Sequence, residues 1–149
     1  MSITIRPLRE NDRNAWCRLW TGYLEYYESS VPKEVYETTF ARLLGDDPTM
    51  PRGLIAERDG EPVGLTHFFF HPHAWRVERV CYLQDLYSAA EARGTGVGRA
   101  LIEAVYAAAD AEGAPSVYWT TQHFNEAGRR LYDRIGRLTP FIKYERVTE

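Results

Sequence analysis

The chain has 149 residues, 44% of them hydrophobic, with 21 acidic against 18 basic side chains and a formal net charge of −3. Its length suits one α/β domain over residues 1–149, and its scattered basic residues disfavour nucleic acid as a partner. No apolar run approaches the roughly 20 residues of a membrane span, and residues 1–9 lack a signal peptide's apolar region, so we expect a cytoplasmic protein with no membrane contact.

Hydrophobic periodicity predicts strands and helices in alternation. We expect a strand at 3–6, helices at 13–27 and 33–44, strands at 54–58 and 62–70, a central strand at 79–88, a helix at 97–112, a strand at 116–120, a helix at 125–135 and a last strand at 141–146. The central strand, the helix after it and the next strand form a β-α-β unit. These two strands should therefore be parallel, with a ligand at their carboxyl ends.

The most informative motif follows the central strand. Three glycines within five residues let the backbone turn tightly and approach a ligand closely. The next helix would then point its free N–H groups at an anion, most naturally a phosphate, while two arginines add positive charge. We call residues 93–98 the glycine loop; with the arginine after it, the motif is Arg93, Gly94, Thr95, Gly96, Val97, Gly98 and Arg99.

Three other interpretations of this motif are a turn without a ligand, a Walker loop and a dinucleotide fingerprint. A tight turn without a ligand is the alternative for an isolated match. A Walker loop needs Lys and then Ser or Thr after its last glycine, where this chain has Arg99 and Ala100. A dinucleotide fingerprint spaces its glycines differently and needs an acidic residue at the end of the next strand. Both of these sites are therefore disfavoured.

Together with the strand before it, this motif resembles the acetyl-CoA motif of the GCN5-related N-acetyltransferases (GNAT). The downstream residues Asn125, Leu131, Tyr132 and Gly136 are similar to the family's second cofactor-contacting helix. The resemblance covers residues 80–136 strongly and the whole chain in order of elements. Within the family, residues 26–32 and 118–119 look most like the yeast histone and polyamine acetyltransferase branch, and next like the diamine acetyltransferases.

The resemblance implies the GNAT fold, an α/β architecture with a mixed central sheet of about six to seven strands flanked by about four helices. It also implies acetyl-CoA as cosubstrate, with its pantetheine arm held between splayed strands. Backbone groups of Leu86, Tyr87 and Ser88 would hold the arm and the acetyl carbonyl, and Asn125 would contact the pantetheine. Tyr132, two helical turns beyond Asn125, would be the general acid for the thiolate, although spacing alone would make it a core aromatic.

The residue that accepts the amine's proton stays open at this point. Relatives of the diamine branch carry a glutamate where this chain has Gln84, which cannot take a proton. Asp85 is adjacent, but strand alternation turns it to the opposite sheet face unless a bulge intervenes. Glu25 and Glu28, near two tyrosines, suit a cationic amine, and a water relay is a further alternative. The candidate acceptor site is Glu25, Glu28, Gln84 and Asp85.

The favoured function is an acetyl-CoA-dependent N-acetyltransferase that acts by direct attack of a polyamine, small amine or lysine side chain. A non-catalytic acyl-CoA-binding domain of the same fold is the alternative. No metal is expected, because His67, His71 and His73 have no further His or Cys cluster beside them. The resemblance implies a homodimer or a higher homo-oligomer.

Overall fold

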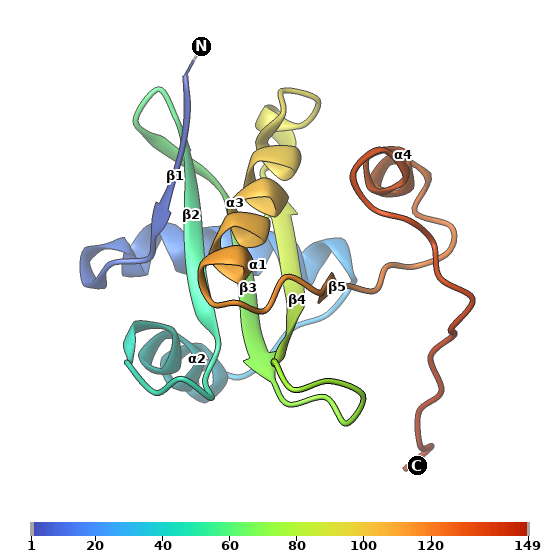
Figure 1. The fold of residues 1–149 in the computed structure, drawn as a ribbon. Helices are drawn as coiled ribbons and strands as arrows, with labels where there is room; N and C mark the ends of the chain where they lie inside the picture. Colours follow the sequence, from blue (N-terminus) through green and yellow to red (C-terminus); the bar gives the residue numbers. More distant parts are fainter. Residues whose placement is uncertain (1, 149) are drawn as a thin grey trace.

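The computed structural model describes residues 2–148, and within them five strands form one mixed sheet in the order β1-β2-β3-β4-β5 (Figure 1). Neighbouring strands are antiparallel except β4 and β5, which are parallel as predicted. The strands are β1 (Ile3–Pro7), β2 (Arg52–Arg58), β3 (Glu61–His71), β4 (Val80–Ser88) and β5 (Val117–Tyr118).

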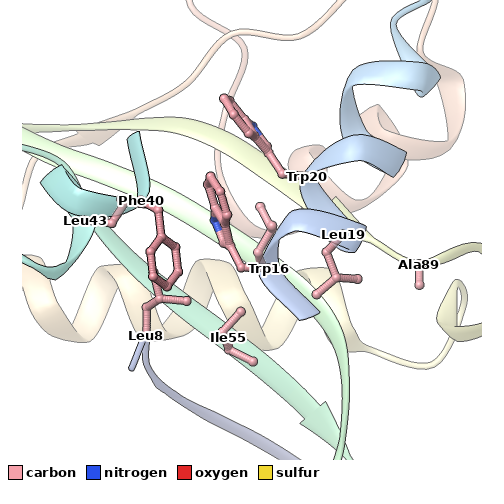
Figure 2. Close-up of a cluster of buried hydrophobic side chains, with 9 residues drawn as sticks. Leu8, Trp16, Leu19, Trp20, Phe40, Leu43, Ile55 and Ala89 are labelled. Atoms are coloured by element: carbon pink, nitrogen blue, oxygen red, sulfur yellow. The ribbon is translucent and has the colours of Figure 1, made fainter. Parts of the chain in front are cut away.

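Helices cover both faces of the sheet (Figure 1). On one face α1 (Arg13–Tyr26) and α2 (Lys33–Leu44) bury aromatic and leucine side chains against β2 and β3, and Figure 2 shows Trp16 at the centre of this cluster. On the other face α3 (Val97–Ala111) packs on β3 and β4, with α4 (Glu126–Ile135) beside it. Short 3₁₀ turns at Glu10–Asp12 and Ala90–Ala92 precede α1 and the glycine loop. Within residues 2–148 no helix is long and apolar enough to cross a membrane.

Because Gly64 of β3 has no side chain, α3 and β4 can both pack closely against β3 at this position. A Cβ atom there would lie 2.8 Å from Val97 Cγ1 and 2.9 Å from the carbonyl oxygen of Tyr87. We expect Gly64→Ala to lower the free energy of unfolding by about 1–3 kcal/mol, because the backbone must shift to admit the methyl group. Urea unfolding monitored by tryptophan fluorescence measures this change.

Gly45→Ala is the control for that measurement. Gly45 has a negative φ of −75°, and a Cβ atom there would meet its nearest neighbours at 3.5 and 3.6 Å, which is ordinary contact. Its unfolding free energy should stay within about 0.5 kcal/mol of wild type. Equal stability of the Gly64 variant and wild type would contradict the packing described here.

Two expectations about the sheet were wrong. It has five strands rather than six to seven, and the strand expected at 141–146 is absent, since residues 137–148 contain no strand. β5 is also shorter than the predicted 116–120. A strand needs a hydrogen-bonded neighbour, and the two residues of β5 offer little edge to pair with. The alternating pattern of residues 141–146 therefore forms an extended segment that runs away from the sheet (Figure 1).

Candidate active site

β4 carries a bulge at Gln84. The pairing with β3 passes from Asp85 opposite His67 to Leu83 opposite Phe68, so Gln84 is an extra residue without a partner. Leu83 packs with the side chains of α3, whereas Asp85 hydrogen-bonds to His67 on the α1 face. The bulge that the sequence named as a condition for a different orientation of Asp85 is therefore present. With it, the Asp85 side chain lies on the sheet face that α1 covers.

β4 and β5 separate just beyond their first paired residues. They pair only at Cys81 with Val117 and at Tyr82 with Tyr118, although β4 continues to Ser88. A narrow pocket of about 30 Å³ lies where they separate, just beyond the carboxyl end of β5 and beside the interior of β4. It is lined by Tyr23, Tyr27, Leu83, Gln84, Leu86, Ile102, Trp119, Thr120 and Tyr132.

The glycine loop joins β4 to α3 beside this pocket. Gly94 and Gly96 have positive φ angles of 78° and 94°, and Gly96 is the cap before Val97, the first residue of α3. The buried Val97 side chain anchors the helix start. The first-turn N–H groups of α3 have no carbonyl one turn earlier in the helix, so they can bind an anion at the loop.

Arg93 connects the loop with the end of α1. Its Nε donates to the Ser88 carbonyl oxygen at 3.2 Å, and its guanidinium lies 5.5 Å from the ring centre of Tyr26 and 5.7 Å from that of Tyr87. Arg99, one turn into α3, lies 3.5 Å from the Glu103 carboxylate and is exposed. Both arginines can therefore contribute positive charge to the anion-binding loop. Thr95 Oγ1 donates to the Ala92 carbonyl oxygen within it.

Tyr132 of α4 borders the pocket from the side opposite α1. Its ring packs edge-on against Trp119 with the ring centres 5.5 Å apart. Burial, and then the neighbouring Tyr27 and Tyr26, raise the pKa of Tyr132 to about 12. The hydroxyl therefore keeps its proton at neutral pH and can donate it.

Asn125 lies at the start of α4 and is not among the residues that line the pocket. Its Oδ1 accepts from the Gly128 N–H at 3.2 Å, and its Nδ2 donates to Thr121 Oγ1 at 3.1 Å. The side chain thus caps the helix, whereas Tyr132 projects from its second turn. The shared face that the sequence spacing suggests for the two residues stays a prediction.

The acidic residues of the predicted acceptor site are spread out. Glu25 and Glu28 are exposed at the end of α1 and do not line the pocket, whereas Tyr23 and Tyr27 of the same helix do. The sequence did not single out Tyr23 as a site residue. The spacing of four residues between the two tyrosines is the signal that puts both on one face.

His67 is a further buried polar residue that sequence analysis considered only as a metal ligand. Its Nδ1 lies 2.8 Å from Asp85 Oδ2, and Trp16 Nε1 donates to its Nε2 at 2.9 Å. Among residues 2–148, no three His, Cys, Asp or Glu side chains gather as a metal site would require. The sequence feature that could have indicated its burial is its place among the apolar residues of β3.

Sequence comparison decides the family. The model of the acetyltransferase (GNAT) family matches residues 16–136. The chain belongs to the GNAT family. As a GNAT protein it is an acetyl-CoA-dependent N-acetyltransferase, and the glycine loop with the separated strands is the arrangement that the sequence predicts for its cosubstrate.

Curated GNAT relatives cover nearly the full chain. This chain is 40% identical over 147 residues to the D-amino-acid N-acetyltransferase HPA3 of Saccharomyces cerevisiae, with 97% of this chain and 90% of the relative covered. It is 28% identical over 143 residues to a thialysine N-epsilon-acetyltransferase of Bos taurus, covering 90% of this chain and 83% of the relative. Kinship with a yeast enzyme agrees with the branch suggested by sequence.

Solved structures share the GNAT fold at low identity. A ribosomal-protein-alanine N-acetyltransferase from Brucella melitensis biovar Abortus 2308 matches with a TM-score of 0.79 and 23% identity, over 98% of this chain and 99% of that one. The structure of AAC(6')-Iy with the bisubstrate analog CoA-S-monomethyl-acetylneamine matches with a TM-score of 0.82 and 18% identity, over 99% of both chains. These matches confirm the GNAT fold that the sequence predicts.

Proposed function

We propose that this GNAT enzyme transfers the acetyl group directly to the primary amine of a small acceptor bound beside α1. The observation that carries this proposal is the pocket between the separated strands. A protonated tyrosine of α4 borders it on one side, and Tyr23 and Tyr27 of α1 border it on the other. A thioester between them would have a proton donor for its sulfur and an aromatic wall for the incoming amine.

The exposed edge of β4 would hold the cosubstrate. Beyond Tyr82 the strand has no pairing with β5, so backbone groups of Leu86, Tyr87 and Ser88 on that edge can bind the pantetheine arm and the acetyl oxygen. The glycine loop and the start of α3 would bind the pyrophosphate, with Arg93 and Arg99 alongside. Tyr132 would protonate the departing thiolate, and Asn125, at the start of α4, would contact the pantetheine.

A free amino acid is the acceptor that we favour. The relatives named for D-amino acids and for thialysine both support an amino acid as substrate. Tyrosine rings suit both the side chain and the ammonium group of such an acceptor, and Glu25 and Glu28 at the rim would attract its positive charge. Polyamines and lysine side chains present the same ammonium group, so they belong in the same test.

An acceptor screen tests this function. Purified protein is mixed with acetyl-CoA and, in separate reactions, D- and L-amino acids, thialysine, polyamines and lysine peptides, and thiol release is followed with a chromogenic disulfide. We expect release above the hydrolysis background with at least one free amino acid, and mass spectrometry should find the acetyl group on its nitrogen. Acetylation of polyamines or peptides alone would contradict the amino-acid assignment. Release with none would contradict the proposed transfer.

We also propose that the enzyme forms a homodimer through its C-terminal segment. Residues 137–148 contain no strand, yet the exposed side chains of this segment include Phe141, Ile142 and Tyr144. β5 is the last strand of the sheet but has only two residues, so this segment finds little strand edge within its own chain. The same segment of a second copy would offer an extended partner and the apolar cover that it lacks.

Phe141→Asp combined with Ile142→Asp should convert the dimer to a monomer, because two charges cannot be buried in an apolar interface. Sedimentation velocity measures the change. Val77→Asp is the control, since Val77 is fully exposed in the β3–β4 loop and should leave the dimer intact. A monomeric wild type, or a doubly substituted protein that stays dimeric, would overturn this proposal.

A further inference from the structure

Three polar side chains form a series from the core toward the pocket. Trp16 Nε1 lies 2.9 Å from His67 Nε2, and His67 Nδ1 lies 2.8 Å from Asp85 Oδ2. Trp16 and His67 are 1% and 2% exposed, while 15% of the Asp85 side chain is exposed. The ring of Trp16 is enclosed by α1, α2 and the sheet (Figure 2). This series thus begins in the rigid core and ends at the bulge of β4.

The hydrogen bonds fix the form of His67. An indole N–H can only donate, so His67 Nε2 must accept and carries no proton. The proton of the neutral imidazole is therefore on Nδ1, from which it donates to Asp85 Oδ2. A second proton on Nε2 would face the Trp16 N–H. The indole N–H thus selects the tautomer of His67 whose proton is on Nδ1.

Tyr23 connects Asp85 with the pocket. Its ring lines the pocket, as do Gln84 and Leu86 on either side of Asp85, and the Asp85 carboxylate is close enough for its charge to act on the Tyr23 hydroxyl. Burial, and then the charge of Asp85, raise the pKa of Tyr23 well above its ordinary value, so the hydroxyl stays protonated. The other ionisable groups that face this series are Tyr27 of α1, Tyr36 of α2 and Tyr82 of β4.

We propose that Asp85 accepts the proton of the acceptor ammonium group through the Tyr23 hydroxyl, and that His67 and Trp16 are positioning residues that hold its carboxylate. The ammonium gives a proton to the Tyr23 oxygen as Tyr23 gives its own proton to Asp85. The amine becomes neutral, Tyr23 is unchanged, and Asp85 becomes a carboxylic acid. His67 cannot take this proton, because its Nδ1 already carries one. This inference rests on the proposed acetyl transfer.

Kinetics of Asp85→Asn and Tyr23→Phe test the relay. We expect kcat/KM for the acceptor to fall by roughly 10²–10⁴-fold in Asp85→Asn near neutral pH, with acetyl-CoA affinity unchanged. The deficit should shrink toward pH 10, because more of the acceptor then arrives already deprotonated. Tyr23→Phe should show the same trend. A deficit that is constant with pH, or a Kd for acetyl-CoA that changes with it, would indicate a structural role and overturn the assignment.

The positioning role has a test that needs no activity. In the wild type, long-range nitrogen–proton NMR should find the proton of His67 on Nδ1 and none on Nε2. Trp16→Phe removes the donor to Nε2, so this nitrogen should become able to carry a proton, and kcat/KM for the acceptor should fall because the Asp85 carboxylate is held less firmly. The NMR result stands even if no acceptor is found, so the two proposals can fail separately.

Trp20→Phe is the matched control. Trp20 stacks on Trp16 in the same helix with ring centres 5.0 Å apart, but its Nε1 has no hydrogen-bond partner among residues 2–148. Its replacement makes the same change of ring in the same cluster and removes no hydrogen bond of the series. It should leave both the His67 proton and the pH profile unchanged. A proton on Nε2 in wild type, or identical behaviour of the two Trp variants, would overturn the positioning role.

Discussion

Replacing Tyr132 by Phe is expected to lower kcat by roughly 10²–10⁴-fold while the Kd for acetyl-CoA stays within about twofold. The phenyl ring can keep the contact with Trp119, so the pocket is preserved, but the thiolate then leaves without a proton donor. Steady-state kinetics with an acceptor found in the screen, together with calorimetric binding of acetyl-CoA, separate the two effects. Equal loss of binding and turnover would indicate that Tyr132 only shapes the pocket.

The raised pKa of Tyr132 predicts how kcat should depend on pH. Because burial raises the pKa of Tyr132 to about 12, the wild-type donor stays protonated throughout the neutral range, and its ionisation should not limit kcat below about pH 10. Tyr106→Phe is the matched control. The Tyr106 hydroxyl donates to the Ile135 carbonyl oxygen at 2.7 Å and so supports the end of α4 without being in the pocket. Its loss should leave kcat within a few-fold of wild type.

Gly96→Glu is expected to raise the Kd for acetyl-CoA at least 100-fold, equivalent to about 2.8 kcal/mol. The φ of 94° at this position strains any residue with a Cβ atom, by about 1–3 kcal/mol. The new carboxylate would also lie at the start of α3, where it would compete with the pyrophosphate for the same N–H groups. Isothermal titration calorimetry measures the loss.

Gly60→Glu controls for the strain. Gly60 has a similar φ of 86°, a Cβ atom there meets nothing within 4 Å, and it lies in the turn between β2 and β3. This variant should lose stability in thermal unfolding but bind acetyl-CoA as wild type does. Tight binding by a folded Gly96→Glu protein would show that the pyrophosphate lies elsewhere.

Local signals predicted the glycine loop, the helices and the parallel pairing of β4 with β5. These features depend on neighbouring residues: glycines permit positive φ, and apolar spacing selects a helix face. The bulge at Gln84 could be named only as a possibility, because it depends on how two distant strands pair. His67 and Asp85 meet across that same pairing, 18 residues apart, so their contact was not predictable from either segment alone.

The C-terminal segment shows the opposite failure. Its alternating residues predict a strand, yet no strand forms among residues 137–148. A strand forms only where the edge of another strand can pair with it, and the pattern of this segment does not specify that neighbour. At Asn125 the observed helix boundary differs by one residue from the prediction, because this residue caps α4 instead of lying inside it.

The position of Arg93 has a consequence for how each ligand affects the affinity of the other. One guanidinium lies over rings of both α1 and β4 while belonging to the loop expected to bind the pyrophosphate. A cosubstrate that attracts this guanidinium changes its contact with Tyr26 and so alters the helix end next to the amine. The two ligands should therefore influence each other's affinity by one common factor, whichever arrives first.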